Sequence, residues 1–362
     1  GTSVSSGIKK GQIVDKEELH HAIERAIRRA ESEVGDRPEK VIASVPYGGI
    51  DFVHNIGLVM SKEETGQISQ QDQDECIRRS KNIVRSSDQK MLHVIPLGFK
   101  VDGNQVKNPV GVFGSNLEVN THIVLGHSEN IVNLTQTLKN CNFRINGIVY
   151  DPIASSQVLL TEEERKNGAI LIDIGGQFTK VSYFRENVLN KSVLIPIGGE
   201  TITSDIAYCL KVAVPEAERL KIIYGELNFS KIDPKETIEI TTTENGRKTI
   251  TRKFLNQIIE ARVQELLKYI KKELGDLLEQ KTVNISGGSG LLNGLGYYVK
   301  TTCAPKLREG LPEPLKPILE STSYASAVGL ILYGLKTNAI SYTSKRHNKW
   351  VAKIMKWARK LF

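Results

Sequence analysis

The segment from 169 to 196 constrains the fold of this chain more than any other stretch. Residues 169–172 are four consecutive apolar side chains, which is typical of a buried strand. Asp-Ile-Gly-Gly follows at 173–176, and residues 181–184 and 188–196 predict two further strands. The sequence therefore predicts a β-meander whose first turn opens with an aspartate and two glycines.

The Asp-Ile-Gly-Gly turn has the composition of a phosphate-binding loop. Its glycines let main-chain N–H groups point toward phosphate oxygens, and a carboxylate such as Asp173 can hold the hydration shell of magnesium. A tight hairpin without a ligand explains the turn equally well. A second cluster, Gly287, Gly288 and Gly290, follows the strand predicted at 282–285 and favours a ligand site. Between the clusters, Glu218 and Lys221 share a helix face, where a solvated salt bridge is the simplest interpretation.

The rest of the chain alternates between helical and strand patterns. We expect helices at 15–34, 66–86, 128–140, 152–160, 200–212, 215–223 and 253–279. Strands are expected at 41–45, 91–95, 117–119 and 122–125, and a hairpin with strands 237–243 and 248–252 flanks Asn245-Gly246.

The net charge of +8 is a property of the C-terminal end. Seven of the 49 lysines and arginines lie in the last 18 residues, which contain no acid, so 42 basic residues face 41 acidic ones elsewhere. A neutral body argues against a nucleic-acid-binding domain. The four cysteines are dispersed, so we expect no metal knuckle, and no apolar run predicts a membrane span or secretion signal.

The C-terminal segment 345–362 has the pattern of a basic amphipathic helix. Its apolar side chains recur at helical spacing and cover about 160° of arc, with lysines on the opposite side. Helices of this kind, with tryptophan on the apolar face, lie in the interface of anionic membranes. A terminal helix docked on its own domain or on a partner protein is the alternative. The apolar set is Trp350, Ile354, Trp357 and Leu361, flanked on the same side by Val351, Met355, Ala358 and Phe362, and the basic set is Lys349, Lys353, Lys356 and Lys360.

Short motifs follow one another in a specific order along nearly the whole chain. They are SGIKKGQIVD (6–15), LHVIP (92–96), NPVG (108–111), ASS (154–156), DIGG (173–176), IPIGG (195–199), SDIA (204–207), EAERLK (216–221), IIEAR (258–262) and YASAVG (324–329). This ordered set resembles the FtsA family of bacterial cell-division proteins within the actin-like ATPase superfold.

The resemblance implies a two-lobed actin-like (Hsp70/actin) α/β fold. The first lobe would comprise 1–49, 129–168 and 318–335, and an FtsA-type subdomain would be inserted at 50–128. The second lobe would span 169–317, with a subdomain at about 200–270. A linker at 336–344 would lead to the membrane-targeting amphipathic helix at 345–362.

The resemblance also implies ATP and Mg²⁺ as ligands, with Asp173 acting through the magnesium hydration shell. Asp151 falls where related ATPases place a polar residue near the attacking water. Arg252 and Arg262 would bind the acidic C-terminal peptide of the tubulin-like FtsZ, although a solvated pair with Glu265 explains Arg262 nearly as well. Phosphate contacts would be Asp173, Gly175, Gly176 and Thr179, and nucleoside contacts Gly199, Glu218, Lys221, Gly287 and Gly288.

Two departures from the family pattern reduce the expected activity to at most a weak ATPase. The usual loop is Asp-Ile-Gly-Gly-Gly-Thr-Thr-Asp, whereas Gln177, Phe178 and Lys180 stand here. We expect the side chain at 177 to oppose a left-handed backbone conformation, and Lys180 to add a phosphate counter-charge. The family's first phosphate hairpin also precedes the point where this sequence begins.

The function implied is that of an actin-like cell-division protein at the septum. It would polymerise on the cytoplasmic face of the bacterial inner membrane, tether the FtsZ ring there and recruit later division proteins. The alternatives are a pilus-assembly adaptor of the same fold and a metabolic kinase or phosphatase of the superfold. The basic amphipathic segment at 345–362 favours the cell-division function over both alternatives.

Overall fold

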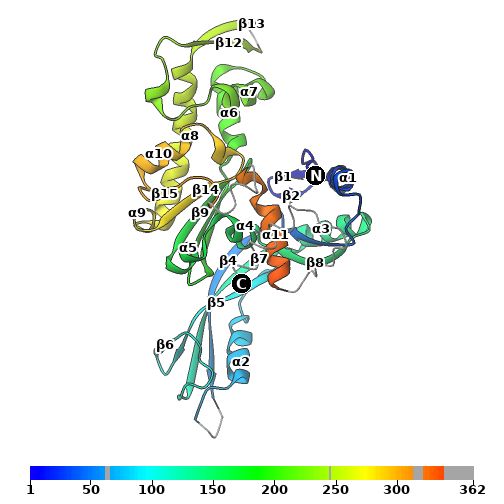
Figure 1. Cartoon of the computed structure of the whole chain (residues 1–362), viewed down its shortest axis with the longest axis vertical. Helices are drawn as coiled ribbons and strands as arrows, with labels where there is room; N and C mark the ends of the chain where they lie inside the picture. The colour runs from blue at the N-terminus through cyan, green and yellow to red at the C-terminus, as the bar shows by residue number, and fades with distance from the viewer. Residues whose placement is uncertain (62–65, 244–245, 313–320, 338–362) are drawn as a thin grey trace. The chain divides into compact units, whose positions relative to one another are not determined.

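The computed structural model describes residues 1–61, 66–243, 246–312 and 321–337 (Figure 1). The chain divides into two compact units. Within the described residues, the first comprises 1–157, 188–191 and 326–337, and the second comprises 158–187 and 192–325. The predicted C-terminal helix and Asn245 of the predicted hairpin turn lie outside the described residues.

The first unit begins with a small hairpin, β1 (Ile8–Lys9) and β2 (Gln12–Ile13), followed by helix α1 (Lys16–Val34). Asp15 starts α1 by accepting hydrogen bonds from the amides of Glu17 and Glu18, both at 2.9 Å, and Gly35 ends it at φ 76°. Strands β3 (Lys40–Ser44) and β8 (Arg144–Val149) pair in parallel. Helices α3 (Ser128–Asn140), α4 (Asp151–Leu159) and α11 (Ala325–Lys336) complete this part.

A four-stranded antiparallel sheet forms the inserted part of the first unit. Its order is β4-β7-β5-β6, with β4 at Asp51–Met60, β7 at Asn116–His127, β5 at Gln89–Val101 and β6 at Asn104–Val106. Helix α2 (Gln70–Ser80) packs on β4 and β7 (Figure 1). Gly57 permits this approach, because a Cβ there would lie 2.1 Å from the carbonyl oxygen of Cys76.

Strand β4 was not among the predicted strands. It lies at the edge of the sheet and leaves Ile56, Leu58 and Met60 more than half exposed. Because apolar residues stand on its exposed face, the sequence of β4 lacks the alternation of apolar and polar residues that predicts a half-buried strand. The predicted helix at 66–86 is shorter than expected, since α2 spans only Gln70–Ser80. A capping box between Ser69 and Asp72 fixes its start.

The second unit is built on a five-stranded sheet with the order β11-β10-β9-β14-β15. The predicted meander is confirmed as β9 (Ala169–Ile174), β10 (Thr179–Arg185) and β11 (Val188–Ile195). Strand β14 (Thr282–Ser286) runs parallel to β9, and β15 (Leu307–Arg308) runs parallel to β14. All six residues of β9 are buried, which explains its continuous apolar run.

The remaining elements of the second unit pack around this sheet or form a small hairpin. The helices are α5 (Glu162–Asn167), α6 (Gly199–Leu210), α7 (Val214–Tyr224), α8 (Arg252–Leu274), α9 (Leu277–Gln280) and α10 (Leu295–Thr302). Strands β12 (Thr237–Thr242) and β13 (Gly246–Thr251) form the expected hairpin. The long helix predicted at 253–279 ends earlier, because Gly275 at φ 53° terminates α8.

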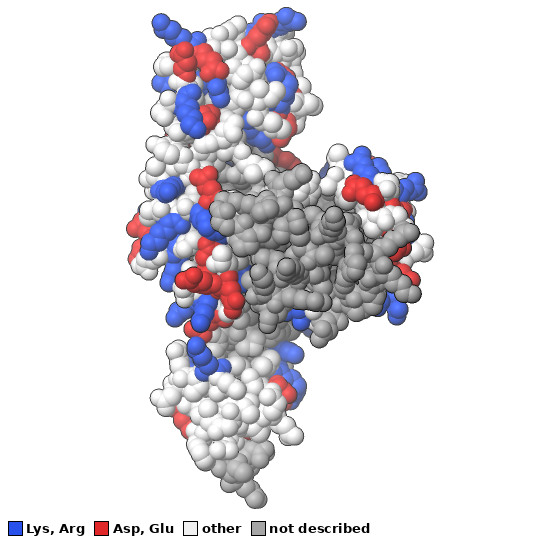
Figure 2. Space-filling view, viewed as in Figure 1, with Lys and Arg blue, Asp and Glu red and all other residues white. Residues whose placement is uncertain are grey.

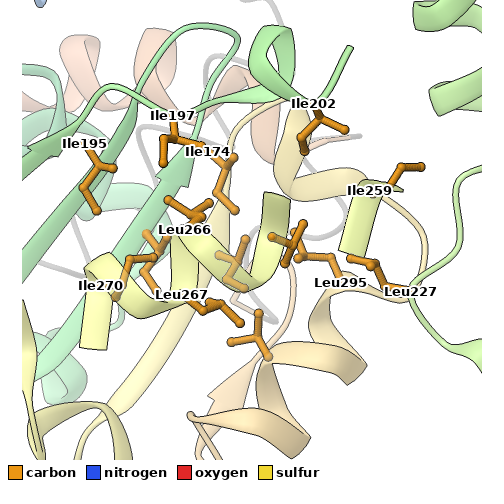
Figure 3. Close-up of a cluster of buried hydrophobic side chains, with 14 of the residues drawn as sticks. Ile174, Ile195, Ile197, Ile202, Leu227, Ile259, Leu266, Leu267, Ile270 and Leu295 are labelled. Carbon is orange, nitrogen blue, oxygen red and sulfur yellow. The ribbon is translucent and has the colours of Figure 1, made fainter. Parts of the chain in front are cut away.

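The core of the second unit joins the sheet to α6, α7, α8 and α10. Side chains from α8 such as Ile259, Leu266 and Ile270 meet sheet residues such as Ile174 (Figure 3). On the face shown in Figure 2, basic and acidic side chains lie next to one another over much of the described surface.

Glu164 connects α5 to β15 through a network of charged and backbone groups. Its carboxylate accepts from the Thr161 amide at 2.7 Å and from Nε and Nη2 of Arg308 at 2.6 and 2.9 Å. Burial raises the pKa of Glu164, but the hydrogen bonds from Arg308 and Thr161 outweigh it and bring the pKa below its ordinary value of 4.5. The ionised form is therefore the one that stabilises the fold.

Replacing Glu164→Gln should lower the free energy of unfolding near neutral pH by about 1–3 kcal/mol, because Arg308 loses a charged acceptor. The stabilisation by a carboxylate of lowered pKa is complete above 4.5 and is lost as pH falls through the folded-state value. The difference between wild type and variant, measured by urea unfolding, should thus shrink in acid. Glu162→Gln, an exposed glutamate of the same helix, is the control. A difference that does not change with pH would contradict this role.

Candidate nucleotide site

The Asp-Ile-Gly-Gly turn joins β9 to β10. The amide of Gly175 donates to the carbonyl of Phe178 at 2.9 Å and closes the turn. Gln177 is not among the residues with positive φ, so the expected conflict at this position is wrong. The side-chain amide of Gln177 instead donates to Oε2 of Glu200 at 3.1 Å, which links the turn to α6.

A second glycine turn, at the start of α6, lies directly on the first. The amides of Gly199 and Glu200 donate to the carbonyls of Gly175 and Gly176 at 2.9 and 2.7 Å. A Cβ at Gly198 would lie 2.4 Å from the carbonyl oxygen of Gly176. The two turns can therefore meet only because Gly198 has no side chain.

The third glycine turn follows β14, which lies next to β9 in the sheet. Gly287 has φ 88°, and a Cβ there would lie 2.3 Å from Oδ1 of Asp173. The next but one residue, Ser289, donates its hydroxyl to the carbonyl of Gly175 at 3.1 Å. Parallel pairing of β9 and β14 thus brings both predicted glycine clusters to one end of the sheet.

Lys221 of α7 joins this end of the sheet to α6. Its ammonium lies 2.7 Å from Oε2 of Glu218 and donates to the Gly199 carbonyl at 3.0 Å and the Thr203 hydroxyl at 2.8 Å. Lys221 is 8% exposed whereas the Glu218 side chain is 44% exposed, so the pair is buried at its lysine end and open to solvent at its carboxylate end. Burial raises the pKa of Glu218, but hydrogen bonds from Lys221 and Thr203 outweigh it and lower the pKa overall.

These groups surround a pocket of about 930 Å³ between α6, α7 and the turn after β14, which we call the α6–α7 pocket. One part of its wall is apolar and another carries hydroxyl, carboxylate, ammonium and backbone groups. The lining comprises Gly176, Gly199, Glu200, Ile202, Thr203, Ser204, Val214, Pro215, Glu218, Lys221, Ile222, Gly288, Ser289, Leu291, Leu292 and Asn293. A wall with both characters suits a ligand that has a flat apolar ring and polar substituents.

Five of the nine predicted nucleotide contacts line the pocket: Gly176, Gly199, Glu218, Lys221 and Gly288. The other four do not. Gly175 belongs to the first turn, where its amide and carbonyl make backbone hydrogen bonds. Gly287 belongs to the third turn, and Oδ1 of Asp173 lies next to it.

Thr179 corrects a prediction, because its side chain lies in the core rather than in the pocket. It is fully buried, and its hydroxyl donates to the Ile197 carbonyl at 2.7 Å. Sequence patterns also missed five polar lining residues: Glu200, Thr203, Ser204, Ser289 and Asn293. The position of Ser289 between Gly288 and Gly290 was a usable signal, whereas Thr203 is marked only by lying one helical turn after Gly199.

The remaining predicted site residues lie elsewhere. Asp151 is the first residue of α4 and is 1% exposed. Arg252, at the start of α8, donates to the Tyr224 carbonyl at 3.0 Å and to Glu236 at 3.1 and 3.2 Å. Arg262 binds both oxygens of Asp205 at 2.6 and 2.9 Å and also contacts Glu265. Both arginines are therefore paired with acids of this chain.

The predicted membrane-binding side chains of segment 345–362 lie outside the described residues. Within the part of the chain that the structure covers, no helix has the length and apolar character needed to cross a bilayer.

Comparison with family models identifies two matching regions. The model for cell division protein FtsA matches residues 170–329, and the model for the SHS2 domain inserted in FtsA matches residues 48–125. The second match covers β4 to most of β7, including the strand that sequence patterns missed.

Solved structures with an actin-like fold are similar to this chain. The PilM–PilN type IV pilus biogenesis complex contains a chain that superposes with a TM-score of 0.65 at 16% identity, covering 91% of this chain and 88% of the other. MreB5 of Spiroplasma citri bound to ADP gives a TM-score of 0.55 at 12% identity, covering 92% and 78%. At these identities the likeness establishes the fold alone, which confirms the predicted actin-like α/β fold.

Sequence relatives extend over nearly the whole chain. Cell division protein FtsA of Borreliella burgdorferi is 30% identical over 373 residues, covering 99% of this chain and 90% of the relative. Cell division protein FtsA of Escherichia coli K12 is 28% identical over 385 residues, covering 100% and 91%. On this similarity and the two family matches, the chain belongs to the FtsA family of cell-division proteins.

Proposed function

We propose that this cell-division protein binds an adenine nucleotide in the α6–α7 pocket. The observation that carries the proposal is the convergence of three glycine turns and the Lys221–Glu218 pair on one cavity. An actin-like protein of similar fold, MreB5 of Spiroplasma citri, is bound to ADP in its solved structure.

Three features of the pocket wall support this proposal. Ile202, Pro215 and Leu292 offer apolar surface to an adenine ring. Glu218, held ionised by Lys221, is an acceptor for ribose hydroxyls. The glycine turns leave open space at Gly288, where no heavy atom lies within 4 Å of a Cβ built there, so that phosphate oxygens could approach the backbone.

We further propose that the protein polymerises at the cytoplasmic face of the inner membrane and tethers the FtsZ ring there. Self-association accords with the actin-like fold, and attachment rests on the sequence of segment 345–362. A single lipid-type anchor binds reversibly, with an association constant of about 10⁴ M⁻¹ for a myristoyl chain. A polymer carries many such segments on one surface, and avidity then converts weak contacts into stable attachment. The assembled layer would recruit later division proteins at the division site.

Filling the pocket should abolish nucleotide binding. Gly288 has α-helical torsions of −60° and −40°, and no heavy atom lies within 4 Å of a Cβ built there. The backbone therefore accepts Gly288→Trp, and the indole occupies the pocket. ADP affinity measured by calorimetry should fall by about tenfold or more, equivalent to about 1.4 kcal/mol. Gly288→Ala is the matched control and should bind ADP as the wild type does. Equal affinity in the tryptophan variant would place the nucleotide elsewhere.

The apolar face of the C-terminal segment should be required for membrane binding. Trp350→Glu combined with Trp357→Glu places two charges on that face and should abolish co-sedimentation with phosphatidylglycerol-containing vesicles. Binding by the wild type should weaken as salt is raised and as anionic lipid is replaced by neutral lipid, because lysines face the headgroups. The control is Tyr208→Glu with Phe254→Glu, two aromatic residues that are 86% and 46% exposed on the body. A tryptophan variant that still pellets, or one that loses its fold, would make the segment a structural or partner helix.

Binding of the FtsZ C-terminal peptide should depend on the positive charge of Arg252 and Arg262. The hydrogen bonds with Asp205 raise the pKa of Arg262 above its usual range, so its charge is permanent. Reversing both arginines to glutamate should weaken peptide binding by about tenfold in an anisotropy assay.

Because both arginines hold acidic partners, charge reversal also breaks ion pairs of the chain itself. Glu236→Gln, Asp205→Asn and Glu265→Gln together break the same pairs but leave both arginines cationic. These acid-side variants should bind the peptide at least as well as the wild type. Equal loss in both sets would mean that the ion pairs act on the structure of α8, and the peptide site would have to be sought elsewhere.

A further inference from the structure

We propose that the ammonium of Lys180 takes the place of a divalent cation beside the α6–α7 pocket, so that this chain binds nucleotide without magnesium. The inference rests on the proposed nucleotide binding and concerns the residue that the resemblance assigned to magnesium, Asp173.

Lys180 and Asp173 form a buried ion pair across the β9–β10 hairpin. The two residues are direct partners in the antiparallel register, and Nζ of Lys180 contacts Oδ2 of Asp173. Lys180 is 7% exposed and Asp173 is 8% exposed. The negative charge of Asp173 is therefore neutralised within the chain, by a group that repels a metal cation.

The other oxygen of Asp173 is also enclosed. Oδ1 lies under Gly287, where a Cβ would come within 2.3 Å of it. Magnesium binds in octahedral geometry, keeps several of its waters and needs anionic oxygen to hold that shell. With an ammonium against one oxygen and backbone against the other, Asp173 does not offer the open carboxylate that a hydrated magnesium ion requires.

Other acids do not supply a replacement within the described residues. Magnesium at a nucleotide is held by only one or two carboxylates besides the phosphates, so the acid nearest the turn is the one to consider. Glu200 lies against Gly176, but the side-chain amide of Gln177 binds its Oε2. The residues of this turn thus do not fit magnesium.

Lys180 has the chemistry to perform the task of the cation. Lysine is a common phosphate-binding residue that acts as a compact point charge. The hairpin that pairs Lys180 with Asp173 leads directly into the turn whose Gly176 lines the pocket. A ligand phosphate near that turn would therefore meet a neutral Lys180–Asp173 pair, instead of the two carboxylates that the usual family loop places there.

The test is calorimetric titration with ADP in excess magnesium and in EDTA. The wild type should bind with the same affinity in both conditions, within about threefold, because no divalent cation takes part. Lys180→Met removes the charge while keeping chain length, and it should weaken ADP binding about tenfold in both conditions. Lys180→Asp restores the usual residue and should bind about tenfold more tightly in magnesium than in EDTA, since two facing carboxylates attract the cation. Lys248→Asp, an exposed lysine of β13, makes the same change in net charge and should behave as the wild type.

The outcomes separate this inference from the proposed function. Wild-type binding that is lost in EDTA but present in magnesium would overturn the role of Lys180 and leave nucleotide binding intact. An unchanged affinity of a folded Lys180→Met, verified by its melting temperature, would also overturn it. Failure of the wild type to bind ADP in either condition would overturn the proposed nucleotide binding and this inference together.

Discussion

The contact between two backbone turns holds the pocket together. The carbonyls of Gly175 and Gly176 receive the first amides of α6, at a separation that a Cβ on Gly198 would prevent. These main-chain bonds fix the start of α6 to the end of β9, and the side chain of Gln177 adds a bond to Glu200. The position of α6 in turn determines where Gly199 and Thr203 face Lys221.

Charge inside the second unit is organised around two buried lysines. Lys221 connects α7 to α6 and keeps Glu218 ionised at the pocket wall, while Lys180 neutralises Asp173 beneath the turns. A buried ion pair contributes little net stability, because desolvation of both charges offsets their attraction. Lys221 and Glu218 belong to the pocket wall, and Lys180 and Asp173 lie beneath the turns, so each pair sets the local charge of its surroundings.

Membership of a family with actin-like fold does not by itself define how this chain uses a nucleotide. The glycines that shape the turns are present, but Lys180 changes the electrostatics of the loop from anionic to neutral. Small changes at the end of a strand can therefore alter the cation requirement while the backbone of the site stays the same.

The sequence by itself determined the buried strand β9, the meander, the glycine clusters and the spacing of Glu218 and Lys221, since these depend on apolar runs and local turn chemistry. It also indicated the helix α8 but placed its end too late, and it missed the edge strand β4, whose exposed apolar residues obscure the alternation. Only the tertiary structure decided that Thr179 points into the core, that Ser289 and Thr203 join the pocket, and that Lys180 pairs with Asp173. These outcomes depend on which strands pair and in which register, and pairing between β9 and β14 joins residues more than a hundred positions apart.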